Sequence, residues 1–109
     1  MNSIRNSVQL IGNLGSEVTS VTLENGQTLT KFPLATNEFY NSSEGEKVQK
    51  TQWHNIVAWG NKGESMAKTL EKGSEVMIHG KLEYRSYEDK EGVKRYSTEI
   101  IANSFFKIG

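Results

Sequence analysis

The chain of 109 residues contains no cysteine and only one proline. Without cysteine it has no disulfide framework, no thiolate metal site and no cysteine nucleophile, which fits an intracellular protein. It also lacks an apolar run long enough to cross a membrane, and residues 1–5 lack the hydrophobic segment of a signal peptide. We therefore expect a cytoplasmic protein with no membrane partner.

A surplus of charge is also missing, because 13 basic residues balance 13 acidic ones. Proteins that bind nucleic acid usually carry a basic surplus. The balance counts only weakly against nucleic acid, since the distribution of charges matters more than their sum. The length suffices for one domain with one core and is too short for two, so a single domain over residues 1–109 is expected.

Runs rich in β-branched and aromatic residues, separated by turn residues, predict a chain made mostly of strands. Such runs cover residues 7–14, 18–23, 28–36, 51–59 and 74–87, and a last run extends from 94 to about 108. Asn25-Gly26 predicts a hairpin in which both residues have positive φ. Gly12 and Gly80 predict bends, and Pro33 predicts an edge or irregular position in its strand.

Residues 37–50 are mainly polar and are expected to form a mobile, exposed loop. Phe39 and Tyr40 are adjacent aromatic residues near the base of this loop. One of them is expected to pack inward and the other to remain available. The pair could anchor the loop or contribute to a binding site.

Residues 61–72 form the convincing helical pattern of the chain. Asn61 and Glu64 have the spacing of a capping box, and Gly73 is suited to end the helix. The apolar stripe, which would cover one opening of a sheet or barrel, consists of Met66, Ala67 and Leu70.

The order of elements is interpreted as three strands, a helix and two strands, with the first hairpin prominent. A helix between the third and fourth strands of a five-stranded chain of this size is the arrangement of an OB-fold. The predicted fold is therefore all-β, a five-stranded OB-fold Greek-key barrel with one helix between strands 3 and 4.

Residues 51–59 contain both tryptophans of the chain. The alternation of side chains along a strand places Trp53 and Trp59 on one face, about 20 Å apart, and His54 on the other. Two aromatic rings on one face suit a strand of stacked bases, whereas the ordinary alternative is that they fill the core. His54 is interpreted as a packed or interface residue rather than a metal ligand.

Basic and aromatic residues interleave most densely between residues 84 and 96. They are Tyr84, Arg85, Tyr87, Lys90, Lys94, Arg95 and Tyr96. This composition suits nucleic acid, and the alternative is an ordinary solvated hairpin.

Candidate catalytic and metal sites are poor. His54 and His79 are the two histidines, and two histidines without cysteine make an unsuitable zinc site. The glycines of residues 12–15 lack the lysine and the strand–loop–helix context of a phosphate-binding loop. We therefore expect no enzyme, no metal and no cofactor.

Several short segments together resemble the bacterial single-stranded DNA-binding protein family of the replicative type. They are VQLIGNLG at 8–15, LAT at 34–36, TQWH at 51–54, KGS at 72–74, GKL at 80–82, RY at 95–96 and TEI at 98–100. They occur in the order and spacing of the family over nearly all of residues 4–108. The resemblance implies an OB-fold that binds and protects single-stranded DNA without sequence preference during replication, recombination and repair. It also implies a nucleoid-associated homotetramer, with a dimer as the alternative.

The resemblance also assigns roles to particular residues. Bases would stack on Tyr40, Trp53, Trp59 and Tyr87, phosphates would contact Lys72, Arg85 and Arg95, and His54 would lie near a subunit interface. Asn55 and Ser86 stand where many relatives carry a basic residue, which predicts weaker electrostatic binding and a shallower salt dependence.

Family members usually continue into a flexible tail with an acidic tip that recruits replication and repair proteins. Because this chain ends at Gly109, recruitment through such a tip is not expected. A second interpretation is a tail-less OB-fold protein-interaction module of the primosome, similar to primosomal replication protein B. A third is binding of single-stranded RNA, which would use the same aromatic surface.

Overall fold

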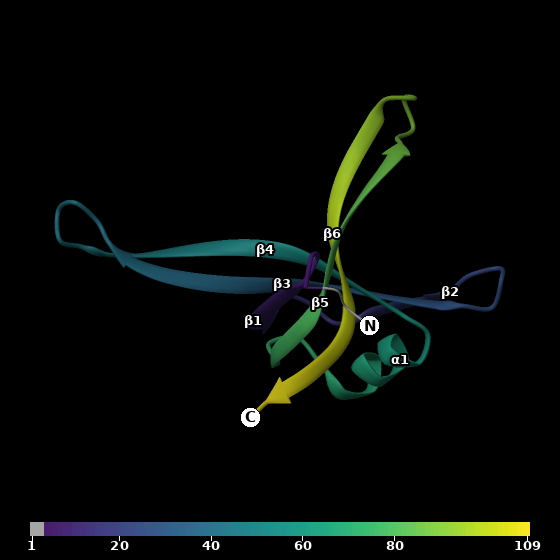
Figure 1. The fold of residues 1–109 in the computed structure, drawn as a ribbon, viewed down its shortest axis with the longest axis horizontal. Coiled ribbons are helices and arrows are strands. Elements are labelled where there is room, and N and C mark those ends of the chain that lie inside the picture. The colour runs from purple at the N-terminus through teal and green to yellow at the C-terminus, as the bar shows by residue number, and fades with distance from the viewer. Residues whose placement is uncertain (1–3) are drawn as a thin grey trace.

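A computed structural model describes residues 4–109 (Figure 1). Its elements are β1 (Val8–Leu14), β2 (Thr19–Thr22), β3 (Thr28–Asn41), β4 (Lys47–Trp59), α1 (Gly60–Thr69), β5 (Glu75–Glu88) and β6 (Lys94–Ile108). Within this part of the chain, no helix has both the length and the apolar character needed to cross a bilayer.

The strands close into a barrel. Their order is β1-β5-β6-β4-β3-β2, and a further pairing of β1 with β3 joins the two sides of the sheet. The pairing of β4 with β6 is parallel, and the others are antiparallel. Because β2 adds only to the outer edge of β3, the barrel consists of β1, β3, β4, β5 and β6. The helix follows the third of these strands, which confirms the predicted five-stranded OB-fold.

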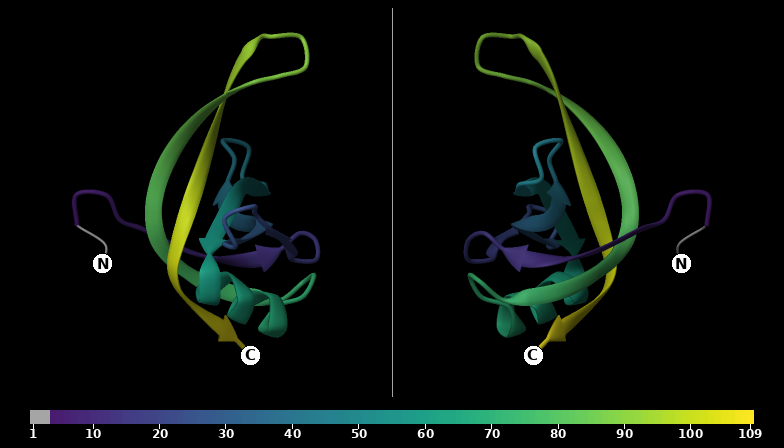
Figure 2. Two further views of the ribbon diagram at one scale, coloured as in Figure 1. Left: turned by 90° about the vertical axis from the view of Figure 1, so that its right-hand side faces the viewer. Right: turned by 90° about the vertical axis from the view of Figure 1, so that its left-hand side faces the viewer.

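The core lies inside the barrel and beneath α1. Its largest fully buried side chains include Leu34, Ile56, Ile78 and Met66, of which Met66 comes from the helix. Figure 2 shows α1 at the end of the barrel opposite the tip of the β5–β6 hairpin. The helix therefore covers one opening of the barrel, as its apolar stripe predicts.

The backbones of neighbouring strands approach closely at two glycines. A Cβ on Gly12 would collide with the carbonyl oxygen of Ala35, and a Cβ on Gly80 would collide with that of Ile101. The register of β5 and β6 also shifts between residues 79 and 80, as in a β-bulge. The bend predicted at Gly80 is confirmed, whereas the ladder of β1 with β5 keeps its register through Gly12, so a bend there stays a prediction.

Pro33 lies where β3 changes its partner. The pairing with β2 ends at Lys31, and the pairing with β1 begins at Leu34. A proline has no N–H to donate, so this gap in the ladder suits it and confirms the predicted irregular position. In the hairpin between β2 and β3, Gly26 has a φ of 87°. Asn25 is not among the residues with positive φ, so the predicted conformation of that turn is wrong for Asn25.

The helix differs from its prediction at both ends. It begins at Gly60, where φ is 62°, and its N-cap is Trp59, without a side-chain capping bond. This sharp turn out of β4 places Asn61 inside the first turn, so the predicted capping box is wrong. The helix ends at Thr69, before the predicted end at residue 72, and Ala67 of the predicted stripe is exposed.

Residues 37–50 do not form the predicted loop. They continue β3 and β4 as a paired ribbon, with a short turn in which Glu44 and Glu46 donate backbone N–H groups to the Ser42 hydroxyl. Phe39 and Tyr40 are 61% and 51% exposed, so the prediction that one packs inward is also wrong. A two-stranded ribbon beyond the barrel has solvent on both faces, which leaves nothing for either ring to pack into.

Candidate nucleic-acid interface

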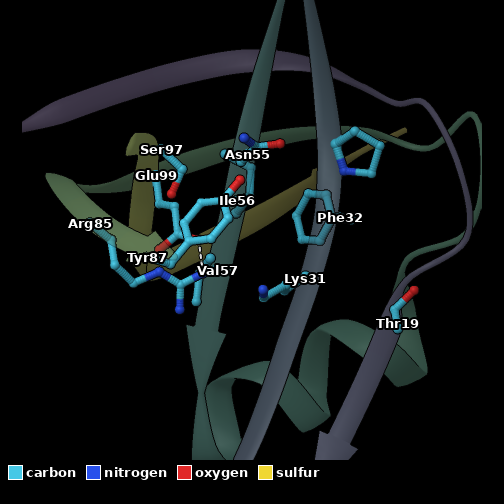
Figure 3. Close-up of a pocket in the computed structure, with 11 residues that line it drawn as sticks. Thr19, Lys31, Phe32, Asn55, Ile56, Val57, Arg85, Tyr87, Ser97 and Glu99 are labelled. Carbon is cyan, nitrogen blue, oxygen red and sulfur yellow. Dashed lines mark hydrogen bonds and ion pairs between the residues drawn. The ribbon is translucent and has the colours of Figure 1, made fainter. Parts of the chain in front are cut away.

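An open groove with a volume of about 560 Å³ lies over the outer face of β4. One wall comes from the β5–β6 hairpin and includes Arg85 and Tyr87, and the opposite wall comes from β3 and includes Lys31 (Figure 3). Pro33 of β3 also lines the groove. Asn55 of β4 lies between the two walls. The groove therefore combines an aromatic ring, cations and polar groups from strands far apart in the sequence.

The two tryptophans lie outside the core on the groove side of β4. Trp53 is 63% exposed and Trp59 is 41% exposed, whereas Ile56 and Ala58 between them are fully buried. The unbroken ladder with β3, in which Trp53 pairs with Ala35 and Trp59 with Leu29, confirms that the tryptophans share one face. Their exposure excludes the alternative in which they fill the core. A second hollow beside the groove includes Trp59 together with Lys31 and Arg85 of the groove walls. The groove therefore continues toward Trp59, whereas Trp53 is not among the residues that line either hollow.

Both arginines that were predicted to contact phosphates form ion pairs within the chain. Arg85 donates from Nη2 to Oε2 of Glu99 at 3.3 Å, and Arg95 donates from Nε to Oδ2 of Asp89 at 2.9 Å. The side chains of both arginines are at least half exposed, so part of each guanidinium still faces solvent. The hydrogen bond from the Val93 backbone, and then that from Arg95, hold the pKa of Asp89 below its ordinary value.

The structure brings some predicted site residues together and leaves others apart. Tyr87 and Arg85 line the groove, Trp59 lines the adjoining hollow, and Arg95 is the register partner of Tyr87. Trp53 lies on the same face of β4, two residues before the groove residue Asn55.

Tyr40 and Lys72 do not belong to the groove. Tyr40 pairs with Val48 far along the ribbon, and Trp53 pairs with Ala35, so alternation places Tyr40 and Trp53 on opposite faces. Lys72 lies after α1, where its backbone N–H donates to Glu17 at 3.3 Å. Nucleic acid confined to the groove would touch neither residue.

Sequence reasoning missed Lys31, Ser97 and Glu99, which all line the groove. Lys31 is the register partner of Val57, so the strand pairing of β3 with β4 would have placed it on the tryptophan face. Glu99 directly precedes the apolar residues 100–102 of β6, and no pattern in the sequence around it indicates that it is buried.

His54 lies on the face of β4 away from the tryptophans, half-buried, with Nε2 at 2.9 Å from Oγ1 of Thr36. Its place at a subunit interface stays a prediction. His79 is likewise paired, with Nε2 at 2.9 Å from the Ser7 hydroxyl. Across residues 4–109, acidic and histidine side chains form no group of three or more that could hold a metal ion.

Comparisons with known proteins agree with this geometry. The single-strand binding protein family matches residues 5–107. Single-stranded DNA-binding protein 1 of Chlorobaculum tepidum is 40% identical over 105 residues, which is 95% of this chain and 65% of the relative. A single-stranded DNA-binding protein of Xanthomonas campestris is 38% identical over 95% of this chain and 60% of its own length. The chain thus spans somewhat less than two thirds of these relatives.

Solved structures show the same likeness. A structure described as Plasmodium falciparum SSB in complex with single-stranded DNA matches over 100% of both chains, with a TM-score of 0.85 and 33% identity. A deletion mutant of the single-stranded DNA binding protein from Thermus aquaticus matches 95% of this chain and 50% of its own, with a TM-score of 0.83 and 25% identity. The barrel and these matches together show that the chain belongs to the single-strand binding protein family.

Proposed function

We propose that this protein binds single-stranded DNA with little sequence preference and protects it during replication, recombination and repair. The observation that carries the proposal is the exposure of three aromatic rings along one surface that is edged by cationic side chains: Tyr87 lines the groove, Trp59 lines the adjoining hollow, and Trp53 lies on the same face of β4. Exposed aromatic rings are costly unless they have a partner, and every base offers a face for stacking. The names of the relatives and the bound DNA of the Plasmodium structure support the same function.

In this proposal, bases stack on Trp53, Trp59 and Tyr87, each stack contributing about 1–3 kcal/mol. Lys31, Arg85 and Arg95 contact phosphates and release counterions. The protein binds without catalysing a reaction.

Tyr40 and Lys72 would contact only DNA that leaves the groove. Tyr40 would meet a strand that crosses to the far face of the β3–β4 ribbon, and Lys72 a strand that passes the end of α1. Their roles therefore depend on a longer DNA path than those of the groove residues.

The proposed assembly is a homotetramer, with a dimer as the alternative. Ile11, Met77 and Phe106 are register partners across β1, β5 and β6, and they form an apolar strip on the outer face of the barrel. Ile11 is 50% and Phe106 65% exposed, which suits contact with a second copy. The half-buried His54 is proposed to lie at a subunit contact as well.

The proposed function can be tested by tryptophan fluorescence during titration with a long oligo-dT at low and at moderate salt. Quenching that saturates and weakens with salt is expected, because bases would stack on Trp53 and Trp59 while phosphates replace counterions. Trp53→Phe and Trp59→Phe variants divide the signal between the two positions. A folded protein that shows no quenching and no binding would instead favour the protein-interaction module.

A further inference from the structure

The face of β4 that carries Trp53 continues along the β3–β4 ribbon. The ladder of β3 with β4 runs without a register shift from the pair Leu29–Trp59 to the pair Asn41–Lys47. Because side chains alternate along a strand, the odd-numbered residues of both strands share the face of Trp53, which we call the tryptophan face. Figure 1 shows the ribbon extending beyond the barrel on the side opposite β2. The surface that begins at the groove therefore continues outward onto the ribbon.

Polar side chains form the first part of the tryptophan face beyond Trp53. Asn37 is the register partner of Thr51. Its Oδ1 accepts hydrogen bonds from Thr51 Oγ1 at 2.7 Å and from Gln49 Nε2 at 3.0 Å. These three side chains hold one another in place across the two strands. The face between Trp53 and Phe39 therefore consists of neutral side chains that a nucleic-acid strand can cross.

Phe39 is an exposed aromatic residue on this same face. Its ring is 61% exposed, and its register partner Gln49 lies four residues before Trp53 on β4. At about 3.4 Å per residue, the Phe39 and Trp53 positions are about 14 Å apart along the ribbon. The Lys47 ammonium lies 5.3 Å from the centre of the Phe39 ring. An exposed ring with a cation beside it suits a base together with its phosphate.

The opposite face of the ribbon is less suited to DNA. Tyr40 lies on that face, and two residues before it Glu38 is the register partner of Lys50. These two charges cancel, and the carboxylate would repel a phosphate near the Tyr40 ring. In residues 37–51, all of which the structure describes, the two strands carry Lys47 and no acidic side chain on the tryptophan face. The charges therefore favour a DNA strand on the tryptophan face.

We propose that the DNA strand leaves the groove past Trp53 and continues on the tryptophan face, where a base stacks on Phe39 and Lys47 contacts a phosphate. The inference rests on the proposed binding of single-stranded DNA and extends the path of that DNA. It gives the stacking role on the ribbon to Phe39 instead of Tyr40, the residue that the sequence resemblance suggests. Two-stranded ribbons twist strongly, and a flexible single strand can follow this twist while it stays on one face.

Phe39→Ala and Tyr40→Ala form a matched pair for the test, because both rings are exposed at adjacent positions of one ribbon. Neither ring lies in the core, so both variants should fold like the wild type, which thermal unfolding checks. Fluorescence titration with a long oligo-dT then measures the affinities. Phe39→Ala should lose about 5- to 30-fold in affinity, the effect of one stacked base, and Tyr40→Ala should bind nearly like the wild type.

A second pair of variants reports contact with DNA directly. Phe39→Trp and Tyr40→Trp are each made in a protein that also carries Trp53→Phe and Trp59→Phe, so that one tryptophan remains. A base that stacks on an indole ring quenches its fluorescence. Saturating oligo-dT should therefore quench the emission of the Phe39→Trp protein and change that of the Tyr40→Trp protein little.

The phosphate contact is tested by the salt dependence of binding. Lys47→Gln should make the slope of log affinity against log salt shallower by about 0.7, because one fewer phosphate is neutralised. Lys50→Gln is the matched control, since Lys50 is an exposed lysine on the opposite face of the same strand. Its slope should stay near the wild-type value. An unchanged slope in Lys47→Gln would overturn the phosphate contact.

The outcomes separate this inference from the proposed function. If a long oligo-dT still quenches Trp53 and Trp59 but binds Phe39→Ala as tightly as the wild type, the path over Phe39 is overturned and the proposed function stands. Equal losses in Phe39→Ala and Tyr40→Ala would also overturn it, because the strand would then use both faces. Wild-type protein that does not bind oligo-dT would overturn both proposals.

Discussion

The indole ring of Trp53 lies against the backbone of Gly15, close enough that a Cβ at residue 15 would collide with two of its ring carbons. The ring is 63% exposed, so the side chain has few other contacts that fix its orientation. Gly15 in turn is held in place by a hydrogen bond of 3.0 Å from its N–H to the Pro33 carbonyl. A glycine between β1 and β2 therefore sets the position of a proposed stacking residue on β4.

Substitution of Gly15 by alanine should weaken DNA binding while the barrel remains folded. The added methyl group would push the Trp53 ring away from its position, and misplaced rings stack less well on bases. We expect a loss of affinity for oligo-dT of about 5- to 30-fold, within the range of one stacking contact. The change would be measured by fluorescence titration, with thermal unfolding to show that the fold persists.

The neighbouring Ser16→Ala substitution is the control for Gly15→Ala, because Ser16 is exposed and its hydroxyl bonds only to the adjacent Glu17 carbonyl. Its affinity should equal that of the wild type. Equal affinities for Gly15→Ala and wild type would show that the position of the Trp53 ring has no influence on binding.

Substitutions of Trp53 and of Ile56 should have opposite effects, one on the affinity for DNA and the other on the stability of the fold. Trp53→Ala should reduce the free energy of DNA binding by about 1–3 kcal/mol and change the free energy of unfolding little, because the ring is largely exposed. Ile56→Val should lower the free energy of unfolding by about 0.5–1.5 kcal/mol, since Ile56 is fully buried, and leave affinity nearly unchanged. Denaturant unfolding and oligo-dT titration of both variants give the four values needed. If Trp53→Ala lowered the free energy of unfolding well below the wild-type value, the ring would have a structural role.

Asp89→Asn should strengthen DNA binding at low salt. The substitution removes the partner of Arg95, and the asparagine oxygen can still accept the backbone bonds that Glu91 and Val93 donate to Oδ1. The freed guanidinium can then contact a phosphate, so the slope of log affinity against log salt should steepen by about 0.7. Titrations at several salt concentrations measure this slope. If affinity and slope both stay at the wild-type values, Arg95 does not reach the DNA.

The same carboxyl group makes a pH-dependent contribution to the hairpin tip. Because the folded-state pKa of Asp89 is lowered, its stabilising contribution is present above the ordinary carboxyl pKa and is lost as the pH falls through the lowered value. NMR titration of the Asp89 carboxyl should therefore give a pKa below that of an exposed aspartate. The Asp89→Asn protein should lack this step in its acid unfolding.

The sequence made the barrel predictable because its strands alternate strongly. In β5, Val76 and Ile78 are fully buried while Glu75 and Met77 are more exposed, and Gly80 marks the bend in that strand. The part of the β3–β4 ribbon formed by residues 37–50 was not predictable in this way, since a ribbon with solvent on both faces needs no alternation of apolar and polar residues. The start of the helix was misjudged because Gly60 turns the chain with positive φ, one residue before the good capping residue Asn61.

The candidate site was predictable only in part, for a different physical reason. Exposed aromatic residues such as Trp53 and Tyr87 could be chosen from their type and periodicity. Glu99 lies beside Asn55 in the groove because closure of the barrel places β4 beside β6, and this pairing joins residues 44 positions apart. Neither periodicity nor composition specifies such a pairing, so the burial of Glu99 and its bond to Arg85 require the tertiary structure.

Phe106→Asp should shift the protein toward smaller assemblies. The ring is 65% exposed on the apolar strip with Ile11 and Met77, so the folded chain would lose little stability from the change. In an assembly that buries this strip, each interface would acquire an unpaired carboxylate, which is strongly unfavourable in an apolar contact. Light scattering would measure the mass of the wild type and the variant at equal concentration.

Tyr84→Asp is the matched control, since Tyr84 is 73% exposed and lies in the β5–β6 hairpin away from the strip. A mass that falls in Phe106→Asp and not in Tyr84→Asp would support self-association through the strip, whereas equal masses in all three proteins would place the contact between copies elsewhere.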